Sequence, residues 1–146
     1  MTGAPAAPDD QGANKVNEIK MAIKSHTDII PARERARRFA EEIGFPSISV
    51  SIIVTAISEL TYNVTKYADE GTLHIKEVKA GDKRGMRITV SDKGPGIPDI
   101  DQAMQEGYST SKGLGLGLPG CKRLMDEFEI HSEVGKGTVI TMTKWM

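Results

Sequence analysis

The longest regular pattern of apolar residues lies between Pro46 and the turn Asp69-Glu70-Gly71. β-Branched residues are common in it and would also suit a strand, but the length and the 3.6-residue period favour a helix. We therefore expect a helix over residues 47–67. Its inward row contains Ile48, Ile52, Ile53, Ala56, Ile57, Leu60 and Val64.

A second helical pattern covers residues 32–43, with Pro31 before it and Gly44 after it as start and stop signals. Its apolar residues share one face. They are Ala32, Ala36, Phe39, Ala40 and Ile43. Four arginines lie mainly on the other face, which we interpret as a solvated surface paired in part with neighbouring glutamates, or alternatively as a docking patch for another protein.

The remaining patterns indicate strands that come in hairpins. Residues 18–24, 72–78, 85–92, 129–134 and 138–145 are expected strands, and residues 99–106 and 118–128 are expected helices. The inward side of the last helix contains Leu118, Cys121, Leu124, Met125 and Phe128. Because hairpins replace alternating βαβ units, we predict an α+β fold, a two-layer α/β sandwich with a mixed or antiparallel sheet covered by helices on one face.

Composition narrows the class of protein. The 146 residues suggest one domain over residues 15–146, preceded by a disordered tail over residues 1–14. A net charge of -1 excludes a global basic field for nucleic acid. No signal peptide or transmembrane-length apolar run is found, so no membrane is expected. Cys121, the single cysteine, allows no internal disulfide and suits the cytoplasm.

Glycines cluster in residues 107–120, named here the glycine loop. Gly113, Gly115 and Gly117 alternate along it, and Lys112 comes just before them. Glycine lets backbone N–H groups approach a charged ligand closely, and such groups beside a helix N-terminus form an anion site. The loop is therefore either a phosphate cradle or a flexible surface turn.

One polar pair interrupts the long helix. Glu59 and Asn63 lie one turn apart on one face, and Lys66 follows three residues later. An amide oxygen is a plausible Mg²⁺ ligand, and a carboxylate is a plausible general base. The alternative is two exposed polar residues on an amphipathic helix.

A second polar motif follows the strand 85–92. Asp92 ends the strand, and Gly94 and Gly96 let the chain fold back over a flat ligand. A carboxylate only accepts hydrogen bonds, so Asp92 could bind an exocyclic amine such as that of adenine. The alternative is an ordinary Pro-Gly turn.

These motifs together resemble the GHKL ATPase superfamily. The order is Glu-x-x-x-Asn, Asp-x-Gly-x-Gly, Gly-x-Gly-x-Gly before a helix, and Gly-x-Gly-Thr in a final hairpin, which covers the chain from about Glu18 onward. Neither a Walker A loop nor a Rossmann fingerprint is present. Within the superfamily, residues 55–60, 92–100 and 117–128 are most similar to the RsbT-type serine-protein kinases of the bacterial stressosome.

The resemblance implies the Bergerat ATP-binding fold and a role for each matched residue. At the adenine end, Asp92 would bind the amino group with Thr138 beside it, and Gly94 and Gly96 would line the pocket. At the phosphate end, Asn63 would hold Mg²⁺ and Glu59 would act as the general base toward a substrate hydroxyl. Lys66 or Lys112 would neutralise phosphate charge. The glycine loop would wrap the phosphates with Gly113, Leu114, Gly115, Leu116 and Gly117.

The resemblance also implies a function. The chain would be an ATP- and Mg²⁺-dependent serine/threonine-protein kinase that phosphorylates STAS-domain partners of the RsbS and RsbR type. Once released, it would activate an RsbU-like phosphatase and so switch on an alternative sigma factor. A homodimer is compatible with this family. The alternative is a binding protein of the anti-sigma-factor type, which sequesters its partner and holds nucleotide mainly for structure.

Overall fold

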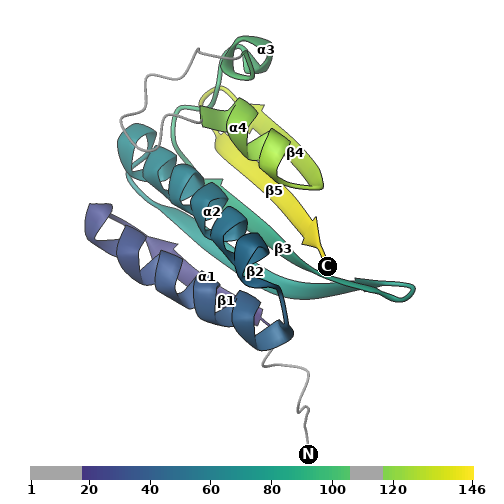
Figure 1. Ribbon diagram of the computed structural model, residues 1–146. Helices are drawn as coiled ribbons and strands as arrows, with labels where there is room; N and C mark the ends of the chain where they lie inside the picture. The colour runs from purple at the N-terminus through teal and green to yellow at the C-terminus, as the bar shows by residue number, and fades with distance from the viewer. Residues whose placement is uncertain (1–17, 106–116) are drawn as a thin grey trace, which may run out of the picture.

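The computed structural model describes residues 18–105 and 117–146. Its sheet has five strands in the order β1-β2-β3-β5-β4. The strands are β1 (Glu18–Ile23), β2 (Gly71–Ala80), β3 (Lys83–Asp92), β4 (Glu127–Glu133) and β5 (Gly137–Trp145). The helices are η2 (His26–Asp28), α1 (Ile29–Ile43), α2 (Ser47–Tyr67), α3 (Ile100–Ala103) and α4 (Gly117–Leu124). Figure 1 shows α1, α2 and α4 on the same face of the sheet.

The two-layer α+β architecture is confirmed, and of the two kinds of sheet that were expected, the described strands form the antiparallel one and not the mixed one. Every pairing between the described strands is antiparallel. The chain path explains this. Helices α1 and α2 return the chain to the end of the sheet where β1 stops, and Ile23 on β1 pairs with Gly71 on β2. Strand β2 must then run opposite to β1. The pairs β2–β3 and β4–β5 are hairpins, and β5 also pairs antiparallel with β3.

Helix α2 is the central element of the core. Ile53, Ile57 and Leu60 are buried on the side that faces the sheet. Ile48, expected in the same row, is 73% exposed. At about 100° per residue, Ile48 lies on the opposite side of the helix from Ile57, so the expected row was too wide.

By length and composition alone, α2 could cross a membrane, which corrects the expectation that no apolar run is long enough. Half of its apolar stretch is buried inside the protein. The core helix of a soluble domain passes the same test, so this feature is weak evidence for a membrane span.

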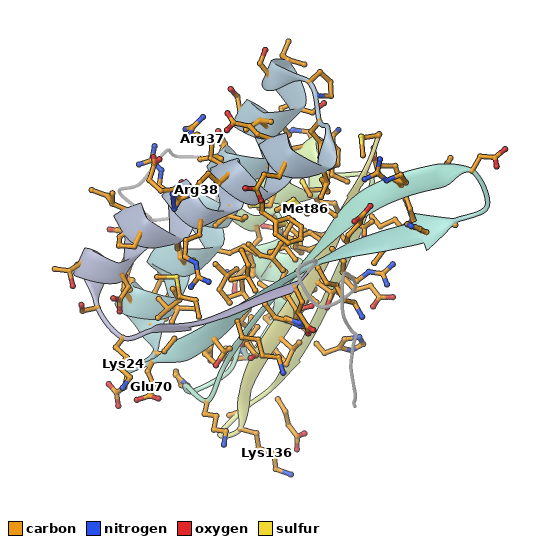
Figure 2. All side chains as sticks on the ribbon, turned by 90° about the horizontal axis from the view of Figure 1, so that it is seen from below. Lys24, Arg37, Arg38, Glu70, Met86 and Lys136 are labelled. Atoms are coloured by element: carbon orange, nitrogen blue, oxygen red, sulfur yellow. The ribbon has the colours of Figure 1, made fainter. Side chains whose placement is uncertain are left out.

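Helix α1 buries all five residues expected on its inward face. It begins at Ile29, earlier than the pattern indicated, and Gly44 at φ 108° ends it in the left-handed conformation. Figure 2 shows Met86 between the sheet and the helices, with Arg37 and Arg38 on α1 away from the sheet. Arg37 lies 3.9 Å from the carboxylate of Glu34, which agrees with a solvated, partly paired surface.

Two expected helices are shorter than their patterns suggested. Helix α4 ends at Leu124, and the next residues join the sheet, because the Asp126 N–H donates to the Thr143 carbonyl. Phe128, expected on the helix, lies on β4 opposite Met142. Helix α3 covers only Ile100–Ala103.

Candidate nucleotide site

Glu59 and Asn63 lie on α2 in unlike surroundings. Glu59 is 1% exposed, and neither carboxylate oxygen has a hydrogen-bond partner among the described residues. Asn63, one turn later, is half-buried. A carboxylate that is buried without a partner costs free energy, which makes Glu59 a candidate functional residue. The expectation of two exposed polar residues is wrong for Glu59.

Helix α4 packs against α2 at this carboxylate. The Cys121 thiol donates a weak hydrogen bond to the Ala56 carbonyl at 3.8 Å. Burial, and then the negative charge of Glu59, raise the pKa of Cys121 to about 12. Gly117, with φ 64°, is the first residue of α4 and lies about one helical turn before Cys121. Cys121 is fully buried, as the sequence predicted.

Asp92 occupies the end of the central strand β3. It pairs with Gly71 on one side and with Thr138 on the other. The Gly94 N–H donates to Asp92 Oδ1 at 2.8 Å. A Cβ built on Gly94 would lie 2.8 Å from the Cβ of Ala68, just past the end of α2. The loop after Asp92 therefore contacts the C-cap residue of the helix that bears Asn63.

The far side of this loop lies on the β4–β5 turn. Gly96 has φ 82°, and a Cβ there would meet the Glu133 carbonyl oxygen at 2.4 Å. The Gly135 N–H donates to the Pro95 carbonyl at 2.8 Å. Glycine at position 96 is required both by the left-handed backbone and by the close approach.

Thr138, the second residue of β5, lies beside Asp92 and is 8% exposed. Its Oγ1 lies 2.8 Å from the Oγ of Ser132. A cavity of about 510 Å³ is bordered by Asp92, Ile130, Ser132 and Thr138 together with Ile100 of α3. Sequence reasoning missed Ser132. The alternation along β4 indicates that Ser132 faces inward, but its pairing with Thr138 depends on the strand register.

Of the two lysines expected at the phosphate end, the structure describes Lys66 but not Lys112. Lys66 is exposed, and its ammonium lies 5.2 Å from the centre of the Tyr67 ring. Lys112, Gly113, Leu114, Gly115 and Leu116 lie outside the described residues. The structure thus brings together Asp92, Gly94, Gly96 and Thr138 at one end, and places Glu59, Asn63 and Gly117 on the adjoining helices.

The comparison with protein families decides the class. Residues 24–144 match the model of the histidine kinase-like ATPase domain. The chain belongs to this family. The superfamily resemblance is therefore confirmed, and the use of a nucleotide follows from the family.

Members of the family with known roles are similar over nearly the whole chain. The serine/threonine-protein kinase RsbT of Bacillus subtilis is 48% identical over 124 residues, which are 85% of this chain and 93% of that protein. An anti-sigma F factor of Caldanaerobacter subterraneus subsp. tengcongensis is 33% identical over 138 residues, 91% of this chain and 95% of that protein.

Solved structures share the fold. The RsbU and RsbW domains of a Mycobacterium tuberculosis protein match with a TM-score of 0.58 and 22% identity, over 87% of this chain and 31% of that one. The mycobacterial sensor histidine kinase MprB matches with a TM-score of 0.51 and 18% identity, over 87% of this chain and 97% of that one. At such identities the likeness supports the fold alone.

Proposed function

We propose that this ATPase-family domain is a switch kinase. It transfers the γ-phosphoryl group of ATP to a serine or threonine hydroxyl of a partner protein. The class of enzyme, a serine/threonine-protein kinase, follows from the 48% identity to RsbT over most of both chains. One observation carries the assignment of the site: the buried Glu59 carboxylate has no hydrogen-bond partner among the described residues.

The phosphate end of the proposed site contains few protein ligands. Asn63 would supply one amide oxygen toward Mg²⁺, and the described residues contain no group of three His, Cys, Asp or Glu that could hold a metal. This fits Mg²⁺, which keeps several waters and takes the rest of its ligands from phosphate oxygens. When bound, Mg²⁺ would neutralise part of the negative charge of the phosphates. Lys66 and Lys112 would add positive charge, and Gly113 to Gly117 of the glycine loop would enclose the phosphates, as the resemblance implies.

The adenine end uses the ends of β3 and β5. Asp92 accepts a hydrogen bond from the exocyclic amino group, and Thr138 lies beside it as its cross-strand partner. Gly94 and Gly96 form the wall of the pocket. Their close contacts with Ala68 and Glu133 support this role, because side chains there would displace the loop.

Glu59 provides the proton chemistry. Its carboxylate would accept the proton of the substrate hydroxyl while the hydroxyl oxygen forms its bond to the γ-phosphorus of ATP. The bond from that phosphorus to the bridging β-phosphate oxygen breaks, and ADP leaves. Phosphoryl transfer requires mainly positioning and charge neutralisation, so this small set of groups is sufficient. The absence of a competing hydrogen-bond partner among the described residues leaves both oxygens of Glu59 available as acceptors.

The partners that we propose are STAS-domain proteins of the RsbS and RsbR type in the cytoplasm. Phosphorylation adds up to about two negative charges to such a partner and weakens its complex with the kinase. The released kinase then binds and activates an RsbU-like phosphatase. The 48% identity to the serine/threonine-protein kinase RsbT of Bacillus subtilis over most of both chains supports this proposal.

The direct test is incubation of the purified chain with labelled ATP, Mg²⁺ and candidate STAS-domain proteins. We expect label on the STAS protein with the wild-type chain and none with Glu59→Gln. Glu129→Gln is the matched control, since Glu129 is exposed on β4 and outside the proposed site. Equal transfer by Glu59→Gln and wild type would remove Glu59 as the base.

A second function is favoured by the similarity to an anti-sigma F factor. In that case the chain would act by sequestering its partner, with nucleotide mainly structural. The same experiment separates the two functions. Tight binding of the partner with no transfer of label, by a wild-type chain that binds ATP, would support the binding protein.

A further inference from the structure

Ser132 is a polar residue at an inward position of β4. Along this strand Phe128, Ile130 and Ser132 face the helices, whereas His131 and Glu133 are exposed. The cross-strand partner of Ser132 is Thr138, and both residues border the cavity that Asp92 also lines. A hydroxyl at the end of an otherwise apolar row requires hydrogen-bond partners when it is half-buried.

Three polar groups surround the Ser132 hydroxyl. The Ile97 N–H donates to Ser132 Oγ at 2.7 Å. The Thr138 Oγ1 lies 2.8 Å from the same oxygen, and the Gly137 carbonyl oxygen lies 3.2 Å from it. A serine hydroxyl can donate one hydrogen bond and accept two, so it can make all three of these contacts at once.

The chemistry of the partners determines the direction of each hydrogen bond. A carbonyl only accepts, so the Gly137 contact requires the Ser132 proton. The Ile97 N–H occupies one lone pair, and the other lone pair then accepts the Thr138 proton. Only this arrangement makes all three contacts hydrogen bonds at once. Because the Thr138 hydroxyl donates its proton to Ser132, only its lone pairs are available to a ligand in the cavity.

Asp92 beside Thr138 is likewise an acceptor, with Oδ1 already occupied by the Gly94 N–H. The cavity therefore contains two neighbouring acceptors at the ends of β3 and β5. Such a pair matches an amino group and repels a carbonyl oxygen. Ser132 also holds the loop at Ile97, directly after Gly96, while the Gly135 N–H holds it at Pro95.

We propose that Ser132 is a positioning residue for base recognition, which orients the Thr138 hydroxyl as an acceptor and fixes the loop from Asp92 to Ile97. The proposal rests on the proposed function, in which Asp92 and Thr138 bind adenine. Ser132 would thus set the preference for a 6-amino purine over a 6-oxo purine, without itself contacting the base.

The test compares the dissociation constants of ATP and of ITP, which has a carbonyl in place of the adenine amino group. We expect Ser132→Ala to weaken ATP binding about 3- to 10-fold, the size of a lost hydrogen bond, and ITP binding less. Ser132→Thr keeps the hydroxyl and should restore the ATP-to-ITP ratio. Ser91→Ala is the control, because Ser91 lies on the opposite face of β3 and outside the cavity.

The outcomes separate this inference from the proposed function. The role of Ser132 would be overturned if Ser132→Ala kept the wild-type ratio of ATP affinity to ITP affinity while Asp92→Asn still weakened ATP binding. Equal losses of affinity for both nucleotides in Ser132→Ala count as a wild-type ratio. Wild-type ATP binding in Asp92→Asn would instead overturn the adenine site itself. Should Ser132→Ala fail to fold, Ser132→Cys keeps the side-chain volume with a much weaker hydrogen-bonding group and should show the same lowered ratio.

Discussion

Asp92 on β3 and Thr138 on β5 are cross-strand partners at the ends of two neighbouring strands. One carboxylate oxygen of Asp92 accepts from the Gly94 N–H at 2.8 Å, and the Thr138 hydroxyl is bound to Ser132. Gly94 thus orients the Asp92 side chain, and Ser132 orients that of Thr138. Each side chain still has lone pairs that can accept a hydrogen bond from a ligand. The strand register, rather than either residue alone, creates the proposed adenine contact.

Asp92→Asn should keep the fold and lose nucleotide affinity. The amide oxygen can still accept from Gly94, but the NH₂ group that replaces Oδ2 becomes a donor facing the adenine amino group. We expect ATP to bind at least about tenfold more weakly, since a donor left facing a donor costs more than a lost hydrogen bond. Isothermal titration of ATP measures the change, with circular dichroism as the check on folding. Unchanged ATP affinity would refute the contact.

Glu59→Gln should abolish phosphoryl transfer and stabilise the domain. The amide cannot accept the substrate proton as a carboxylate does, so transfer stops while ATP binding persists. Removing a buried charge without a partner also removes its desolvation cost, and we expect unfolding to require about 1 to 3 kcal/mol more. Chemical denaturation measures the stability. A variant that is both inactive and less stable than the wild type would show that Glu59 is structural.

The sequence predicted the elements that have a strong period and missed those set by distant contacts. The inward face of α1 is confirmed residue by residue, because local spacing determines it. The end of α4 was misplaced, since the backbone of Asp126 bonds to Thr143 on a distant strand. For the site, the motif spacing indicated Glu59 and Asp92 as candidates, and their roles stay predictions. It could not identify Ser132, whose role depends on the register with Thr138 and on Ile97.

Gly96 and Gly135 have nearly equal backbone angles, φ 82° and φ 83°, but different surroundings. A Cβ on Gly96 would lie 2.4 Å from the Glu133 carbonyl oxygen, whereas one on Gly135 meets nothing within 4 Å. Gly135→Ala should therefore cost only the left-handed backbone strain, about 1 to 2 kcal/mol. Gly96→Ala should cost more and also weaken ATP binding, because the loop must move. Equal losses of stability in urea unfolding would contradict the packing of the loop on the hairpin.

Cys121 gives a prediction about pH. Burial and the charge of Glu59 raise its pKa from 9.0 to about 12 in the folded domain. Between these two values the folded state keeps the thiol proton that the unfolded chain loses, so stability must fall as the pH rises through this window. The loss for one group is at most about 1.4 kcal/mol per pH unit.

Cys121→Val isolates this effect, because it keeps a small apolar side chain and removes the titrating group. We expect the difference in unfolding free energy between wild type and variant to be constant below pH 9 and to move in favour of the variant above it. The same burial predicts that a thiol reagent at pH 8 labels the native chain far more slowly than the urea-unfolded chain. Rapid labelling of the native chain would show that α4 does not cover Cys121 against Ala56 as the 3.8 Å contact indicates.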